Sequence, residues 1–379
     1  MPSVSIIVPI FNGLRYFPYF LESLARALPG DAELIFVDDG SSEPVLDAIP
    51  DDFPVTSVVR LRNERNFGYS VAVNRGFDHA TGDIVVQLNT DLVLDRSCIT
   101  AMMDLIESSP RTGIVGSKQI FPTTGALRHI GVAFGLRDYR LVYVGMSASH
   151  PLCCKTRAVQ VVSGATQAMT RKVLDEIGKL DERYYNTHEN TDHCLKAQRR
   201  GYVNYACAES IAYHWVAQSG PARFARADED NALFWSEWAG RSVRDLDRFV
   251  DEALDSVLER HPTLIGYPFQ PLSLCMSYDE AILLERLERR WTGAASRVMH
   301  TRVYNNAAKK HWLPMELPHR AMLAPVPYVY LVDSIDDLSE NRLWFEMRRT
   351  VIDTELVVDA NACVITTEEL LALYGAPVA

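Results

Sequence analysis

One short segment, residues 82–91, constrains the fold of this chain more than any other. Ile84–Leu88 is a mainly apolar run that stops abruptly at Asn89, Thr90 and Asp91. A run of this kind between turn-forming residues predicts an interior strand of a parallel sheet, and open α/β sheets bind ligands at the carboxyl ends of such strands. Asp91, with Asn89 beside it, offers the oxygen ligands that suit a divalent metal chelating a diphosphate. The segment therefore predicts an enzyme that handles a nucleotide-linked group.

Strand-like and helix-like patterns alternate through the N-terminal part of the chain. This spacing is typical of βαβ units, so we expect an α/β fold with a mostly parallel central sheet and helices on both faces. Strands are predicted at 4–10, 33–37, 55–61 and 84–88, and helices at 16–28 and 70–80. Beyond these, we expect helices at 99–108, 171–178 and 193–200, a short strand at 113–116, and hairpins or a loop at 121–151.

Length and charge narrow the class of protein. A chain of 379 residues is long for one core, so we expect two domains, 1–225 and 226–379. The net charge of -11 argues against a nucleic-acid partner, which would need a basic surface. No segment reaches the ~18 consecutive apolar residues of a membrane span, and the first residues lack a signal-peptide pattern. We therefore expect a cytoplasmic protein.

Candidate nucleotide-binding residues follow the second strand and precede the second helix. Asp38 and Asp39 open a Gly-Ser-Ser turn, where a carboxylate either accepts hydrogen bonds from a uracil or thymine ring or from ribose, or simply caps the turn. Near Asn66 and Asn74, Gly68 allows close backbone approach, and the two amides either fix loops or bind a nucleotide. The G-x-G-x-x-G fingerprint is absent after the early strands, which argues against an NAD or FAD enzyme.

Two further segments carry titratable side chains. The histidines at 188 and 193 are five residues apart, whereas a zincin motif needs a spacing of four, so a zinc-protease site is rejected. The carboxylates of Glu189 and Asp192 then either stabilise the start of the following helix or supply a general base. His214, after an apolar stretch, either packs among aromatic residues or completes a metal site with Asp91.

Taken together and in order, these segments resemble the inverting family-2 glycosyltransferases, which have the GT-A fold, over residues 4 to about 220. The resemblance is specific because eight pieces occur in register. They are residues 4–12 (VSIIVPIFN), 37–42 (VDDGSS), 65–68 (RNFG), 87–91 (QLNTD), 163–165 (SGA), 178–182 (GKLDE), 189–192 (ENTD) and 213–214 (YH).

The resemblance implies a nucleotide-sugar site and a metal. Asp38 or Asp39 would contact the nucleobase and ribose. Asp91, joined by His214, would hold Mn²⁺ or Mg²⁺ against the diphosphate of a UDP- or dTDP-linked sugar. The acceptor would be a glycan or a lipid-linked saccharide. Asn89 replaces the first Asp of the family's Asp-x-Asp, as in rhamnosyl- and galactofuranosyltransferase branches. The other expected nucleotide-sugar-binding residues are Pro9, Asn12, Asn66, Gly68, Asn74, Asn89 and Gly164.

The chain departs from the family at Asn190. The family has Asp at that position, where it deprotonates the acceptor hydroxyl, and a neutral amide is not basic enough to do so. Glu189, Asp192 or a loop carboxylate would then act as the base, with Glu189 the nearest substitute. The alternative is a catalytically weak or inactive GT-A module that binds nucleotide sugar or glycan within a larger assembly.

The C-terminal region is predicted to be mainly helical and to end in a small α/β piece. Within it, residues 282–312 are rich in Arg and Lys and include an amphipathic pattern. Such a stretch either packs on its own domain or rests on anionic lipid, at the inner face of the membrane. Strands are predicted at 328–332 and 355–358 and a helix start at 366–371.

Overall fold

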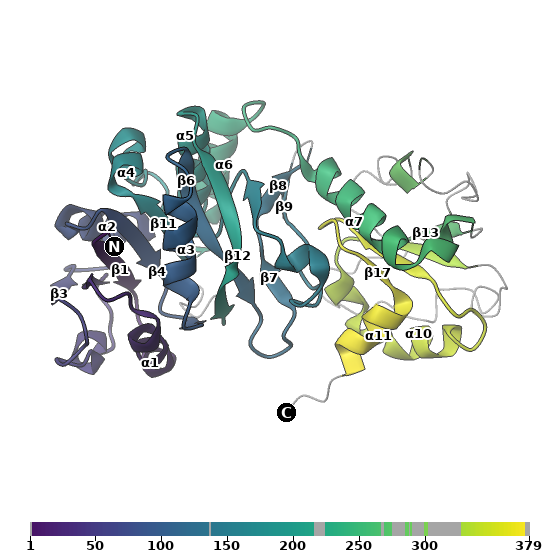
Figure 1. Ribbon diagram of the computed structural model, residues 1–379, viewed down its shortest axis with the longest axis horizontal. Coiled ribbons are helices and arrows are strands. Elements are labelled where there is room, and N and C mark those ends of the chain that lie inside the picture. The colour runs from purple at the N-terminus through teal and green to yellow at the C-terminus, as the bar shows by residue number, and fades with distance from the viewer. Residues whose placement is uncertain are drawn as a thin grey trace. The chain divides into compact units, whose positions relative to one another are not determined.

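The computed structural model describes residues 2–135, 138–215, 224–266, 269–274, 285–287, 289, 299–301 and 327–375. The chain forms two compact units (Figure 1). Unit 1 comprises Met1–Pro122, Leu127–Ala133 and Cys153–Val243, and unit 2 comprises Thr123–Ala126, Phe134–Leu152 and Arg244–Ala379. None of the helices in the described part of the chain is both long enough and apolar enough to cross a membrane.

Unit 1 is built on a ten-stranded mixed sheet, which confirms the predicted α/β class with a mostly parallel centre. The main strand order is β10-β12-β6-β11-β4-β1-β2-β3, and β1 to β4 are mutually parallel where they pair. The first four strands are β1 (Val4–Ile10), β2 (Ala32–Asp38), β3 (Ser57–Arg62) and β4 (Ile84–Leu88). Because they run the same way, their carboxyl ends meet at one edge of the sheet.

Alternation of side chains along β1 explains how the sheet is covered on both faces. Ile6 and Val8 belong to the apolar core that includes residues of α1 (Phe17–Ala27) and α3 (Cys98–Glu107). Ile7 points to the other face, where Gly76 of α2 (Tyr69–His79) packs so closely that a Cβ at residue 76 would lie 2.3 Å from Ile7 Cγ2. A strand with both faces buried is therefore mainly apolar, which is the pattern that predicted it.

The remaining elements of unit 1 differ in part from the sequence prediction. The strand predicted at 113–116 is longer, β6 (Thr112–Ile120), and β11 (Thr166–Thr170) and β12 (Val203–His214) were not predicted. The helix predicted at 193–200 starts four residues earlier, as α5 (Glu189–Arg199). Residues 189–192 therefore lie inside the helix and not before it. The other elements of unit 1 are β5 (Leu92–Leu94), β7 (Leu127–His129), β10 (Arg157–Val159), α4 (Arg171–Ile177), α6 (Ala227–Trp238) and the 3-10 helix Val45–Ala48. Strand β8 (Val132–Phe134) and the 3-10 helix Pro151–Cys154 each include residues of both units.

Unit 2 contains helices and a second, five-stranded sheet in the order β14-β13-β15-β16-β17, which fits the predicted helical region followed by a small α/β piece. This sheet begins at Gln270, well before the first strand predicted there. The amphipathic stretch predicted at 282–312 lies almost entirely outside the described residues. The elements are β9 (Tyr139–Leu141), α7 (Leu246–Arg260), a 3-10 helix (Pro262–Gly266), β13 (Gln270–Leu274), β14 (Met299–Thr301), β15 (Tyr328–Val332), a 3-10 helix (Ile335–Asn341), α10 (Arg342–Arg348), β16 (Leu356–Asp359), β17 (Val364–Thr366) and α11 (Thr367–Gly375).

The compact units divide at Val243/Arg244, whereas the sequence predicts a domain boundary at 225/226. The helix between these positions, α6, is tied to unit 1 by two buried hydrogen-bonded contacts. Trp238 Nε1 donates to Asp192 Oδ1 at 3.0 Å, and the Asp230 carboxylate accepts backbone N–H bonds from residues 185–187. Contacts of this kind place α6 with unit 1, although its composition resembles that of the region beyond it.

Candidate active site

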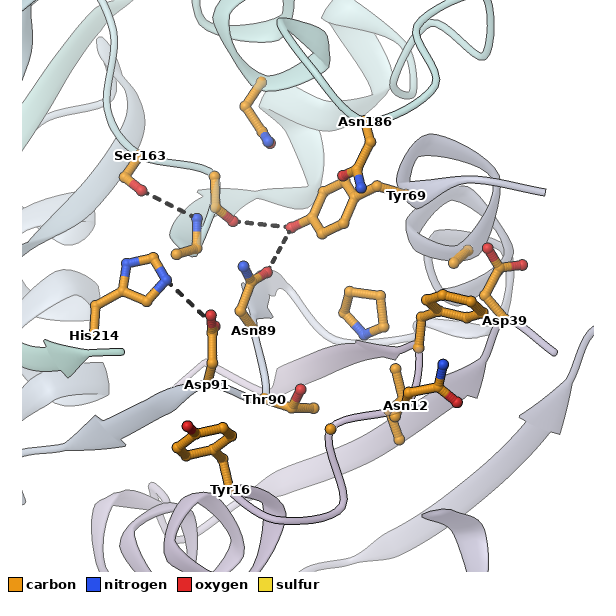
Figure 2. A pocket seen from close by; sticks show the side chains of 18 of the residues that line it. Asn12, Tyr16, Asp39, Tyr69, Asn89, Thr90, Asp91, Ser163, Asn186 and His214 are labelled. Carbon is orange, nitrogen blue, oxygen red and sulfur yellow. Dashed lines mark hydrogen bonds and ion pairs between the residues drawn. The ribbon is translucent and has the colours of Figure 1, made fainter. Parts of the chain in front are cut away.

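A pocket lies at the carboxyl ends of β1, β2 and β4 in unit 1, and most of the predicted site residues line it (Figure 2). This is the edge of the sheet where the sequence places a ligand. The predicted residues that line the pocket are Pro9, Asn12, Asp39, Asn66, Asn89, Asp91, Gly164, Glu189, Asn190 and His214.

The side chains of Asp91 and His214 point toward each other in this pocket, with His214 Nε2 3.3 Å from Asp91 Oδ1 (Figure 2). His214 ends β12, and that strand pairs with β5, which directly follows Asp91. On the far side of the imidazole, Nδ1 lies 2.9 Å from Gln119 Oε1. Since an amide oxygen only accepts, Nδ1 donates its proton to Gln119, and Nε2 is the ring nitrogen that faces Asp91.

This pair fits a divalent cation. A nitrogen lone pair and a carboxylate oxygen at 3.3 Å repel each other unless a proton or a cation lies between them. No group of three or more His, Cys, Asp and Glu side chains is arranged for a metal among the residues that the structure describes. Asp91 and His214 would supply two ligands. That number suits Mg²⁺ or Mn²⁺, which are commonly held by one or two side chains together with substrate phosphates and water.

Asn89 lies one residue beyond β4, where its side chain is held by Tyr69 (Figure 2). The Tyr69 hydroxyl is 3.1 Å from Asn89 Oδ1 and 2.9 Å from the Gly164 carbonyl oxygen. It thus ties the end of β4 to the 163–165 loop. This bridge fixes the floor of the pocket beside Asp91.

The structure separates the two neighbouring carboxylates after β2. Asp39 lines the pocket and accepts hydrogen bonds from Asn63 Nδ2 at 2.7 Å and from the backbone N–H of Gly68 at 2.9 Å. Burial raises the pKa of Asp39 above its ordinary value, although these hydrogen bonds offset part of that increase. Asp38 is fully buried beneath the turn, where it binds Ser41 N–H and Arg62, and it does not line the pocket. Of the two predicted alternatives, Asp39 is therefore the one that lines the pocket.

Glu189 and Asn190 enter the pocket from the first turn of α5. Glu189 is only 5% exposed, and its Oε1 accepts a hydrogen bond from Asn190 Nδ2 at 2.6 Å. Asn190 Oδ1 accepts from Gln87 Nε2 at 2.8 Å. The described residues thus bring a carboxylate and an amide side by side in the same pocket as Asp91 and His214.

The other predicted residues serve the surrounding structure. Asp192 is fully buried and binds Lys196 Nζ at 2.7 Å and Trp238 Nε1. Burial raises its pKa above the ordinary value, although these two partners offset part of that increase. Asn74 joins α2 to the backbone of Leu180. Gly68 has φ +104°, and a Cβ there would lie 2.6 Å from a backbone oxygen, so the position requires glycine. These three and Asp38 do not line the pocket.

Several pocket residues were not predicted from the sequence. Tyr16 precedes α1, and Arg128 lies on β7, within the stretch that sequence patterns left as hairpins or a loop. Asn186 belongs to the loop before α5. No sequence periodicity distinguishes these residues. Arg128 is a cation in the same pocket as the candidate metal ligands, which suits an anionic ligand, but only the structure shows that it lies there.

Comparison with known proteins finds a matching family model and several relatives of similar sequence. Residues 5–178 match the model of the family described as glycosyl transferase family 2. The chain is 26% identical over 247 residues to the O-antigen biosynthesis protein RfbC of Myxococcus xanthus, covering 63% of this chain and 19% of that protein. It is 34% identical over 94 residues to the undecaprenyl-phosphate 4-deoxy-4-formamido-L-arabinose transferase of an Enterobacter strain, covering 24% of this chain and 29% of that protein. The chain thus spans less than a third of the length of either relative.

Among solved structures, the chain is similar to a mannosyltransferase from Pyrobaculum calidifontis in complex with GDP-Man and Mn²⁺. The sequence identity is 18% and the TM-score 0.46, and the match covers 64% of this chain and 66% of that one.

Proposed function

Since residues 5–178 form a domain of glycosyl transferase family 2, we propose that this chain is a metal-dependent, inverting glycosyltransferase. It would move a sugar from a nucleoside-diphosphate donor to a saccharide acceptor. The observation that carries the proposal is one pocket in which Asp91 faces His214 at 3.3 Å and which the Glu189 carboxylate also lines. That set combines candidate ligands for a cation with a candidate base.

The metal would be Mn²⁺ or Mg²⁺, held by the Asp91 carboxylate and His214 Nε2. When bound, such a cation neutralises the charge that develops on a leaving diphosphate. The protein's own contribution is to fix the two ligands: Gln119 orients the imidazole, and the pairing of β5 with β12 brings the two segments together. Arg128 adds a cation to the same pocket, where it would bind phosphate oxygens.

The donor would be a UDP- or dTDP-linked sugar. Asp39 supports this because a carboxylate accepts hydrogen bonds from the ring N–H of uracil or thymine or from ribose hydroxyls. Pro9, Asn12 and Asn66 line the pocket with Asp39 and would complete the nucleoside site.

Glu189 would act as the general base. The acceptor hydroxyl would give its proton to the Glu189 carboxylate while its oxygen forms a bond to the anomeric carbon. The bond from that carbon to the diphosphate breaks, and its electron pair leaves with the diphosphate. Attack from the face opposite to the leaving group inverts the anomeric configuration. Asp192 is not proposed for this role because Lys196 and Trp238 bind it away from the pocket.

The acceptor would be a glycan or a lipid-linked saccharide. The names of the two relatives, one in O-antigen biosynthesis and one an undecaprenyl-phosphate transferase, support this class. With a lipid-linked acceptor, the enzyme would act in the cytoplasm at the inner face of the membrane, and the basic stretch at 282–312 would be the contact.

Incubation with a panel of sugar nucleotides and Mn²⁺ tests the proposal, with release of the nucleoside diphosphate as the readout. We expect release from at least one UDP- or dTDP-sugar, faster when a saccharide acceptor is added. Asn190 favours a second candidate, a module that binds nucleotide sugar without transferring it. Binding of nucleotide by calorimetry, with no release from any donor, would replace the first function by the second.

A further inference from the structure

A chain of hydrogen-bonded side-chain amides ends at Glu189. Asn190 Nδ2 donates to Glu189 Oε1 at 2.6 Å, and Asn190 Oδ1 accepts from Gln87 Nε2 at 2.8 Å. Gln87 lies on β4 and is 1% exposed. It also donates to Oε1 of Gln167, its partner in the pairing of β4 with β11, at 3.1 Å. The first turn of α5 is thereby anchored to the centre of the sheet.

Each amide in this chain has its direction set by its neighbours. A carboxylate only accepts, so Asn190 must turn its nitrogen to Glu189 and its oxygen to Gln87, which must donate. At the other end, Gln167 Nε2 donates to the Val162 carbonyl oxygen, and its own oxygen accepts from Gln87. One orientation is consistent with every hydrogen bond between these side chains, and in it Gln87 Nε2 is the donor while Gln87 Oε1 is buried without a hydrogen-bond partner.

Packing adds a further constraint on Asn190. A Cβ on Gly164 would lie 1.8 Å from Asn190 Nδ2, so the amide occupies the space that any larger residue at 164 would need. The Gly164 carbonyl oxygen also accepts from Gln87 Nε2 at 3.1 Å. Asn190 is therefore held by contact with the backbone as well as by its hydrogen bonds.

We propose that Asn190 is a positioning residue, which holds the Glu189 carboxylate at the acceptor hydroxyl with Gln87 as its anchor. The inference rests on the proposed function and assigns a role to the amide that stands at the family's base position. An ionised carboxylate has about four lone-pair sites, so one N–H bond orients it and leaves others for the acceptor proton. A base held in place needs no ordering of its long side chain at the moment of reaction.

Two substitutions test the positioning role directly. Asn190→Ala removes the donor to Glu189, and Gln87→Met removes the anchor at similar volume. For both, we expect kcat for transfer to fall by about 10- to 100-fold, with KM for the donor and calorimetric nucleotide affinity unchanged. Circular dichroism and thermal melts show whether each variant folds. Normal kcat in folded Asn190→Ala would overturn the inference and leave the proposed function standing.

Asn190→Asp gives a readout that a merely structural role would not change. The shape is kept, but a second carboxylate then lies against Glu189, and two carboxylates in contact ionise together only at higher pH. The acidic limb of the pH–rate profile should move to higher pH. The other titratable or charged groups that line the pocket are the same in both proteins: Tyr16, Asp39, Tyr69, Asp91, Arg128 and His214.

The double variant Asn190→Asp with Glu189→Gln separates a positioning residue from a lost base. We expect it to be as inactive as Glu189→Gln alone. If Asn190→Asp gained activity and kept it without Glu189, the carboxylate at 190 would be the base, and the inference would be wrong.

A measurement without turnover keeps the inference testable if no donor is found. The side-chain amide resonances of Asn190 are identified by NMR as the pair missing in Asn190→Asp. We expect them to shift in Glu189→Gln, because a neutral amide oxygen replaces the charged carboxylate as the acceptor. Unchanged resonances would overturn the inference, whereas shifted resonances in an inactive parent would contradict only the proposed function.

Discussion

Gln119 Oε1 lies 2.9 Å from His214 Nδ1 and thereby fixes which ring nitrogen faces Asp91. A hydrogen bond of this kind to a metal-binding histidine orients the ring, and its loss typically lowers metal affinity by about 10- to 100-fold. Gln119 is 1% exposed and does not line the pocket itself.

Gln119→Leu should therefore weaken Mn²⁺ affinity in that range, and His214→Ala should weaken it more and lower turnover as well. The measurement is a calorimetric titration of the protein with Mn²⁺ in the presence of nucleoside diphosphate. Unchanged metal dependence in His214→Ala would mean that the imidazole only packs.

Glu189→Gln tests the base. The substitution keeps the shape of the side chain and removes its basicity, and general-base assistance is typically worth about 10²- to 10⁴-fold in rate. Transfer should fall by that factor while nucleotide affinity is retained. Asp192→Asn is a useful comparison, because Asp192 serves the surrounding structure. Any fall in its transfer rate should be accompanied by a lower melting temperature. Wild-type transfer in Glu189→Gln would remove Glu189 from the mechanism.

Asp230 of α6 organises the loop before α5. Its carboxylate accepts backbone N–H bonds from Tyr185, Asn186 and Thr187 at 3.1–3.2 Å. Asp230→Ala leaves these groups without that partner, at a cost of about 1–3 kcal/mol. We expect lower stability in urea and slower transfer, because Asn186 of this loop lines the pocket. Asp228→Ala, at an exposed position of the same helix, should match the parent in both measurements.

The strands of the fold were predictable where the sequence contains a short, mainly apolar run. β1, β2 and β4 are mainly apolar because both of their faces are buried, and this pattern identified them. β12 was not predicted because polar residues such as Asn204 and Ser210 are buried within it and interrupt the apolar pattern. Asn204 Nδ2 there donates to the backbone oxygens of Gln160 and Cys194.

Pocket residues were predictable where they follow a strand and hard to predict where tertiary contacts decide their role. Asp91 follows β4, and the structure brings it to His214, as expected for a shared site. Asp38 and Asp39 are adjacent in the sequence, and only tertiary structure shows that Asp38 is used in the turn, where it binds the Ser41 N–H and Arg62. The contacts of Asn190 with Gln87 and Gly164 join segments far apart in the chain, and no local pattern encodes them.

The buried histidine of α5 predicts a dependence of stability on pH. His193 is fully buried and lies 2.8 Å from the Gly178 carbonyl oxygen, and burial lowers its pKa from 6.5 to about 4. Between those values the unfolded chain binds a proton that the folded chain does not. The free energy of unfolding should therefore decrease as the pH falls from about 6.5 towards 4, by at most about 3 kcal/mol from this residue.

His193→Gln removes this titration and keeps an N–H donor for Gly178. Urea unfolding at pH 7 and pH 4.5 should show a smaller difference between the two pH values in the variant than in the parent. An equal difference would mean that His193 makes no contribution to the acid sensitivity.

The most direct measurement of the account is metal-dependent nucleotide binding by Asp91→Ala. Calorimetry with UDP and dTDP, with and without Mn²⁺, compares the parent, this variant and Asp83→Ala. Asp83 is exposed at the other end of β4, so its substitution controls for the loss of one negative charge. We expect Mn²⁺ to strengthen nucleotide binding in the parent and in Asp83→Ala, and to have no effect in a folded Asp91→Ala protein. Equal Mn²⁺-dependent affinity in Asp91→Ala and the parent would contradict the site at the end of β4.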